Sequence, residues 1–153
     1  MMISILQQLR RLVRRNRGPG LDPEVRSSPL AAPGGEKMVL IVDLDGRTGS
    51  PLGQSLARSG FGPHVVRRGG AALGMLGRAA PAAVIVAGPA DPDLYRALRR
   101  ATRVPLLALD PQADDAQVLA AFAAGVDQFQ AGPISPDEVV ARVQALLRRF
   151  PAR

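Results

Sequence analysis

Short apolar runs alternate with segments of helical periodicity along most of the chain. Between residues 38 and 149, five apolar runs are each followed by a segment in which apolar residues recur about every 3.6 positions. This alternation predicts a parallel sheet with helices on both faces. We therefore predict an α/β fold with a five-stranded, doubly wound parallel sheet. The predicted strands are 39–42, 64–67, 82–87, 105–109 and 128–130, and the predicted helices are 49–59, 70–79, 93–102, 115–125 and 136–149.

The first 37 residues have a different pattern. Apolar residues at helical spacing, including Ile5, Leu9 and Leu12, predict an amphipathic helix over 1–17. Residues 18–37 are rich in Pro, Gly and Ser and predict a flexible linker. The other faces of the predicted helix carry arginines: Arg10, Arg11, Arg14 and Arg15. The predicted organisation is a basic helix (1–17), a linker (18–37), a domain (38–149) and a tail (150–153).

Three interpretations of segment 1–17 stay open. It packs on its own domain or on a second copy, it anchors the chain on an anionic membrane surface, or it docks onto a partner protein or nucleic acid. Nucleic acid is the least favoured partner, because no aromatic residues interleave with the arginines. The segment is too short and polar to span a bilayer and lacks a signal-peptide cleavage site. We expect a cytoplasmic protein, with peripheral membrane attachment as the alternative.

The amino-acid composition excludes or disfavours several kinds of functional site. The chain has no cysteine and a single histidine, His64, which excludes disulfides and thiolate ligands and disfavours zinc. We expect His64 to be a surface or hydrogen-bonded residue. Lys37 is the single lysine and precedes the first predicted strand. We expect no cofactor.

Four segments carry a family resemblance. In order and spacing, VLIVDLD, PAAVIVAGPADPD, VPLLALD and FAAGVDQFQAGPISPDEVVARVQALLRR resemble the receiver domain of bacterial response regulators. The resemblance covers 38–149, and its last segment is the most specific. It implies a flavodoxin-like fold in which an aspartate ending the third strand accepts a phosphoryl group. An acidic pair after the first strand would hold Mg²⁺, and a Ser/Thr and a Lys after the last two strands would contact the phosphoryl group.

Most of the family's functional positions are changed in this sequence. The acidic pair falls on Asp43 and Leu44, and the phospho-acceptor falls on Ala87, which has no nucleophile. The Ser/Thr position falls on Asp110 and the lysine position on Gly132. The resemblance therefore implies a degenerate pseudo-receiver that is not phosphorylated at Ala87 and has no catalytic residue.

Asp45 follows the second acid position by one residue. A shift of one residue along a strand points a side chain the other way, so we expect Asp45 to be turned from that position. Asp43, Asp45 and Asp110 are weak candidates for holding a cation. In the alternative interpretation, Asp43 and Asp110 are solvated or paired with an arginine such as Arg47.

The end of the domain keeps the family's structural pattern. Phe129 falls at the switch aromatic, and Pro133 falls where the family has a proline after a cis peptide bond, which a Gly–Pro bond permits. The predicted helix 115–125, strand 128–130 and helix 136–149 match the surface that receivers use for dimers and partners. We predict a signalling adaptor that acts by protein–protein contact in a two-component or related pathway. The interface candidates are Val118, Arg142 and Gln144.

Two other functions stay open. DLDGRT (43–48) resembles the signature of haloacid-dehalogenase-like phosphatases, although Arg47 interrupts it and no lysine follows. Asp114–Asp115 imitates their later acidic pair but also suits the start of a helix. A nucleotide-binding module is weakly indicated, because neither GxGxxG nor GxxxxGK[ST] is present. No output domain follows residue 149, so we expect no direct transcriptional control by this chain alone.

Overall fold

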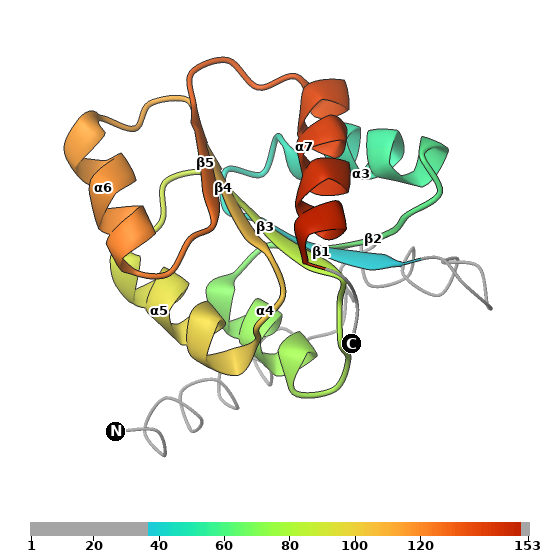
Figure 1. Cartoon of the computed structure of the whole chain (residues 1–153), viewed down its shortest axis with the longest axis horizontal. Coiled ribbons are helices and arrows are strands. Elements are labelled where there is room, and N and C mark those ends of the chain that lie inside the picture. Colours follow the sequence, from blue (N-terminus) through green and yellow to red (C-terminus); the bar gives the residue numbers. More distant parts are fainter. Residues whose placement is uncertain (1–36, 151–153) are drawn as a thin grey trace.

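The computed structural model describes residues 37–150 (Figure 1). The predicted helix 1–17, almost all of the linker and the last three residues lie outside this range. Ten elements alternate strictly between strand and helix, as the sequence predicts. They are β1 (Met38–Asp43), α3 (Gly49–Arg58), β2 (Gly62–Val66), α4 (Gly69–Leu76), β3 (Ala83–Ala87), α5 (Pro92–Ala101), β4 (Leu106–Asp110), α6 (Asp115–Ala123), β5 (Gln128–Ala131) and α7 (Pro136–Arg149).

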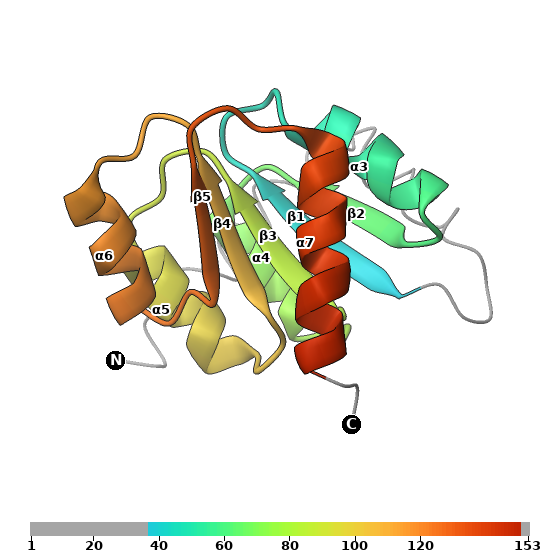
Figure 2. The same cartoon turned by 45° about the horizontal axis from the view of Figure 1, so that its top comes forward.

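The five strands form one parallel sheet in the order β2-β1-β3-β4-β5. Helices α3 and α7 cover one face, and α4, α5 and α6 cover the other (Figures 1 and 2). Strands β3 and β4 are buried at every position, because alternate side chains enter the two cores. The first core joins Ile41 and Ile85 to α3 and α7, and the second joins Leu40 and Val84 to α5 and α6. The predicted fold is therefore confirmed.

The starts of helices α5 and α6 are set by capping residues that the sequence predicts. Asp114 and Gln117 form a reciprocal capping box at α6, with both bonds 2.8 Å long. Asp91 caps α5 by accepting the backbone N–H of Asp93 at 2.8 Å. The second acid of the Asp114–Asp115 pair lies in the first turn of α6, where it suits the helix dipole. The pair therefore serves the helix start, as the capping interpretation expects.

Element boundaries differ from the prediction by up to three residues. The largest difference is in α4, which ends at Leu76 because Gly77 begins a turn. Strand β2 begins at Gly62, two residues before the predicted start, where the N–H of Gly62 donates to the carbonyl of Lys37 at 2.9 Å. Helix α7 begins and ends where predicted.

One arginine joins two loops at the amino edge of the sheet, the α5–β4 and the α6–β5 connections. The Arg99 guanidinium donates to the carbonyls of Thr102, Val104 and Gly125 and forms an ion pair with Asp127 at 2.9 Å. The same carboxylate oxygen of Asp127 accepts the first N–H of β4 at 2.8 Å. Both side chains are mostly buried, 26% and 22% exposed. This network fixes the entries of β4 and β5.

Candidate functional site

The carboxyl edge of the sheet gathers the positions that the family resemblance singles out. Asp43 ends β1 and lies opposite Ala87, the last residue of β3. Asp110 ends β4, which is the next strand, and Gly132 follows β5 directly. The strand order changes direction between β1 and β3, where ligands bind in open parallel sheets. The sequence therefore placed these residues at one edge correctly.

Ala87 is fully buried beneath two touching loops. Its carbonyl accepts the N–H of Leu44 at 2.8 Å, and the N–H of Gly88 donates to Leu109 at 2.8 Å. Gly88 has a φ of +108°, and a Cβ there would lie 2.9 Å from the backbone nitrogen of Asp45. The close approach of the two loops therefore requires glycine at this position. Ala87 offers neither a nucleophile nor an open approach to one.

Asp43 and Asp45 form a carboxyl pair at the start of α3. The Asp43 side chain is hydrogen-bonded to Asp45 and accepts the N–H of Gly46 at 3.1 Å. Asp45 accepts the N–H of Arg47 at 2.8 Å, and the N–H and hydroxyl of Thr48 at 3.0 and 2.7 Å. The expectation that Asp45 points away is wrong. Strand β1 ends at Asp43, so the alternation of a strand does not extend to Asp45.

The two carboxyl groups have opposite pKa shifts. Burial raises the pKa of Asp43, and the hydrogen bond with Asp45 raises it further. Burial alone would raise the pKa of Asp45, but hydrogen bonds from Asp43 and from the Arg47–Thr48 turn lower it to about 2. Asp43 is 3% exposed, so the expectation of a solvated Asp43 is wrong.

Gly49 is needed because Asp43 lies against the first turn of α3. A Cβ on Gly49 would lie 2.5 Å from Oδ2 of Asp43. The backbone N–H of Gly49 hydrogen-bonds to the carboxyl group and favours its charged form. This bond offsets only part of the desolvation, since the pKa of Asp43 is still raised.

We expect Asp43→Asn to raise the free energy of unfolding at pH 7 by about 1–3 kcal/mol. Asparagine keeps an acceptor oxygen for Gly46 and donates to the Asp45 carboxylate, while it removes a desolvated charge. The raised pKa means that the contribution of Asp43 to stability is fully present below pH 3.8 and is lost as the pH rises through its folded pKa. Chemical denaturation between pH 3 and 8 should therefore show the gain shrinking toward acid. Asp115→Asn, at an exposed site, is the control, and an equal gain in both variants would contradict the account.

Asp110 is buried at the end of β4 beside the single tyrosine of the chain. It is 7% exposed, and its Oδ1 accepts the N–H of Gln112 at 3.0 Å. The expectation that Asp110 is solvated is therefore wrong. Burial raises the pKa of Tyr95 to about 12, and the charge of Asp110 contributes to the shift. The Tyr95 hydroxyl thus keeps its proton at any physiological pH.

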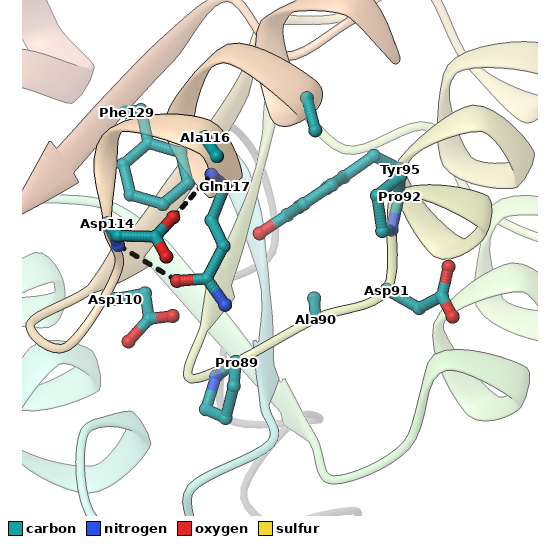
Figure 3. Close-up of a pocket in the computed structure, with 11 residues that line it drawn as sticks. Pro89, Ala90, Asp91, Pro92, Tyr95, Asp110, Asp114, Ala116, Gln117 and Phe129 are labelled. Carbon is teal, nitrogen blue, oxygen red and sulfur yellow. Dashed lines mark hydrogen bonds between the residues drawn. The ribbon is translucent and has the colours of Figure 1, made fainter.

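An open cleft of about 520 Å³ lies beside the Ala87 position, between α5 and α6 (Figure 3). Eleven residues line it, and Asp43, Ala87 and Gly132 are not among them. Its wall combines three carboxylates with two aromatic side chains. The lining residues are Pro89, Ala90, Asp91, Pro92, Tyr95, Asp110, Asp114, Ala116, Gln117, Ala120 and Phe129.

Phe129 is half-buried and lines this cleft, as its interpretation as packing predicts. The Gly132–Pro133 bond is trans, as is every peptide bond among the described residues, so the implied cis bond is not found. A side-chain hydrogen bond holds the loop that follows β5: Nε2 of Gln130 donates to the carbonyl of Pro133 at 3.2 Å.

The described residues contain no group of three or more His, Asp or Glu side chains arranged to hold a metal ion. Asp43 and Asp45 contact each other, but Asp110 does not complete a trio with them. His64 lies on β2 and is 5% exposed, and its Nε2 has no hydrogen-bond partner among the described residues. Burial, followed by the charge of Arg78, lowers the pKa of His64. The expectation of a surface or satisfied histidine is therefore wrong.

The sequence interpretation missed the strongest features of the α6 surface. Leu119 and Phe122 are 69% and 45% exposed, the largest exposures of big apolar side chains among the described residues. Of the three interface candidates, Gln144 is exposed, Val118 is half-buried, and Arg142 forms an ion pair with Glu138 at 3.0 Å. The available signal was the absence of any charged residue between Asp115 and Asp127.

Comparison with known proteins is consistent with this geometry. The chain is 30% identical over 115 residues to the sensory transduction protein RegX3 of Mycobacterium tuberculosis, covering 72% of this chain and 51% of RegX3. It is 32% identical over 115 residues to the DNA-binding response regulator MtrA of Mycolicibacterium smegmatis, covering 72% and 50%. A crystal structure of a putative response regulator from Chloroflexus aurantiacus superimposes with a TM-score of 0.67 and 29% identity, over 75% of this chain and all of that one.

The domain has the flavodoxin-like fold of response-regulator receiver domains. No protein-family model matches the sequence, and the chain spans about half the length of the curated relatives it matches. Among the helices of residues 37–150, none combines the length and the hydrophobicity needed to cross a bilayer.

Proposed function

We propose that this domain is a pseudo-receiver, a signalling adaptor that acts by protein–protein contact without aspartyl phosphorylation. The observation that carries the proposal is Ala87, a buried methyl group at the end of β3 where the resemblance requires a carboxylate. The single lysine, Lys37, precedes β1 and so lies at the opposite edge of the sheet. No ammonium group in the described residues can neutralise a phosphoryl group at the carboxyl edge.

The surface formed by α6, β5 and α7 supports a binding role. Leu119 and Phe122 expose apolar side chains three residues apart on α6, which places them side by side. Aromatic and aliphatic side chains of this kind are typical anchors of protein interfaces. The proposed partner is a protein, or a second copy of the chain, that covers this surface.

Beryllofluoride tests the absence of a phosphoryl site. We expect amide NMR spectra of the full chain to be unchanged by Mg²⁺ and beryllofluoride at Asp43, Ala87 and Asp110, because no carboxylate reaches the Ala87 position. Mg²⁺-dependent shifts at these three residues would contradict the proposal.

Surface substitutions test the binding role. We expect Leu119→Ser with Phe122→Ser to abolish binding to any partner or second copy while changing the free energy of unfolding by less than about 0.5 kcal/mol, because both side chains are exposed. Sedimentation of the chain alone measures self-association, and titration calorimetry measures a candidate partner. Arg47→Ser with Gln54→Ser, on the α3 side, is the control. Equal binding by both variants would place the interface elsewhere.

Membrane attachment through residues 1–17 stays a prediction, because these residues lie outside the described range. Flotation with anionic vesicles tests it. Loss of vesicle binding on deletion of 1–17 is the predicted result, and unchanged binding contradicts it.

A further inference from the structure

A buried imidazole lies on the face of the sheet that α4, α5 and α6 cover. His64 is in β2, opposite Leu40 of β1 in the sheet register, and both Leu40 and Val66 belong to the core on that face. Helix α4 packs against β1 and β2 there (Figure 1). His64 is 5% exposed, and its Nε2 reaches neither solvent nor a hydrogen-bond partner among residues 37–150. A neutral ring tolerates this position, whereas an imidazolium there loses its hydration.

Among the described residues around His64, no carboxylate is placed to pair with a proton on the ring. Helix α4 has no ionisable side chain, and Asp43, the acid of β1, lies on the other face against Gly49 of α3. On α5, which packs on α4, Asp93 is already paired with Arg96 at 2.6 Å. Every charged side chain from residue 46 to residue 90 is an arginine: Arg47, Arg58, Arg67, Arg68 and Arg78. A proton on His64 would therefore add a buried positive charge to cationic surroundings.

The direction of the pKa shift of His64 follows from this setting. Burial, and then the charge of Arg78, lower the pKa of His64 below its usual value of 6.5. The unfolded or opened chain therefore binds the proton more tightly. The stability that the neutral ring permits is complete above pH 6.5 and is lost as the pH falls from there toward the folded pKa. Asp43 acts in the opposite direction, because its raised pKa favours the folded state in acid.

Helix α4 has little support of its own. Three of its eight residues are glycine, which is a poor helix former, and no side chain caps its first turn. Of its residues, Gly70 and Ala72 are fully buried, while Leu73 and Leu76 are half-buried. The strand beneath it, β2, is an edge strand. Release of α4 therefore breaks no pairing between strands.

We propose that His64 makes the packing of α4 acid-sensitive: protonation of its imidazole favours an open state in which α4 leaves β1 and β2. The imidazolium recovers its hydration only when α4 moves away, so proton binding and opening are coupled. The open state exposes the apolar side chains of Leu73 and Leu76 and the core residue Leu40. The inference goes beyond the adaptor function. Its test uses neither beryllofluoride nor a partner, so the two proposals fail separately.

The single histidine of the chain allows a direct first test by NMR. We expect the imidazole signals of the full chain to keep the shifts of a neutral ring as the pH falls below 6.5. A titration midpoint at or above pH 6.5 would overturn the proposal, because it would show a ring that is hydrated or paired with a carboxylate.

Amide hydrogen exchange of the full chain at pH 7 and pH 5 measures the opening itself. Protection factors are ratios to the intrinsic exchange rate, which removes the direct effect of pH on exchange. The Ala72 amide donates to the Arg68 carbonyl at 3.1 Å and reports on α4. We expect its protection to fall by up to about tenfold for each pH unit below 6.5, because one proton is taken up on opening.

The Val84 amide is the reference for global unfolding, since it donates to the Pro105 carbonyl at 2.9 Å between β3 and β4. Global unfolding also exposes His64, so the effect of pH alone does not separate the two events. Ala72 should be less protected than Val84 at both pH values, and low urea concentrations should affect its exchange less, because local opening exposes less surface. Equal protection and equal urea dependence would show that the domain unfolds as a whole and would contradict the proposal.

His64→Gln removes the titrating group and keeps a polar side chain. We expect the protection factor of Ala72 in this variant to be the same at pH 7 and pH 5. His64→Leu is a second neutral variant and should give the same flat profile, whatever the absolute stability of either variant. A pH dependence as steep as that of the wild type would assign the effect to another group.

Arg78→Gln removes the cation that helps to lower the pKa of His64, so the protection of Ala72 should fall less between pH 7 and pH 5. Arg103→Gln, at an exposed position in the α5–β4 connection, is the matched control and should keep the wild-type profile. A wild-type profile in Arg78→Gln would contradict the cationic surroundings on which the proposal rests.

Discussion

Ala87→Asp is expected to lower the free energy of unfolding by about 3–5 kcal/mol at pH 7, although it restores the residue type that phosphorylation requires. Ala87 is 0% exposed, and the new carboxylate would lie opposite the buried Asp43 in the sheet register. The closed contact between Gly88 and Asp45 leaves no room for a hydration shell. Burial and the neighbouring carboxyl group both raise the pKa of the introduced acid. Its ionisation therefore opposes folding.

Ala87→Asn is the matched control, because asparagine has nearly the same shape without the charge. Urea unfolding at pH 7 should show Ala87→Asp to be clearly less stable than Ala87→Asn. The difference should shrink toward pH 4, because a raised pKa gives a contribution that is present at low pH and lost as the pH rises. Combining Ala87→Asp with Asp43→Asn should recover part of the loss. Equal stability of the two single variants at pH 7 would show that the site is open to water.

Arg99→Ala is expected to have the second large effect. It should lower the free energy of unfolding by about 2–4 kcal/mol. The substitution leaves Asp127 without its cation and leaves the carbonyls of Thr102, Val104 and Gly125 without a donor. The estimate lies below that for a fully buried pair, because about a quarter of each side chain is exposed.

Two further substitutions test whether the stabilising effect of Arg99 depends on the geometry of its guanidinium group or only on its positive charge. Arg99→Lys keeps the charge but cannot reach three carbonyls and a carboxylate with one ammonium group, so it should recover less than half of the loss. Arg100→Ala removes an exposed arginine from the next position and should change thermal stability little. Equal effects at 99 and 100 would contradict the role of this network.

Much of the fold was predictable because its strands are short and apolar on both faces. The segments VLIV and AAVIVA predict buried parallel strands directly. Because parallel strands all end at the same edge of the sheet, the predicted strand ends then place Asp43, Ala87 and Asp110 together at that edge. Helix starts were also legible, since Asp91 and Asp114 are ordinary capping residues.

The rest depends on loop conformation and on contacts between distant segments. Asp45 turns back toward Asp43 because β1 ends there, and no strand periodicity reports that bend. Tyr95 meets α6 at the cleft through tertiary packing, so its position there has no local signature in the sequence. The apolar helix 115–125 gave no sign of which side is exposed, because apolar residues occur all round it. Leu119 and Phe122 were therefore missed.

Intact mass after incubation with acetyl phosphate and Mg²⁺ tests the central claim most directly. The full chain is predicted to keep its unmodified mass, because Ala87 has no nucleophile and no lysine lies at the carboxyl edge. Amide spectra of the same sample should be unchanged around Asp43 and Asp110. An adduct of one phosphoryl group mapped to Asp43, Asp45 or Asp91 would contradict the claim and would make this domain a phosphoryl acceptor with a displaced site.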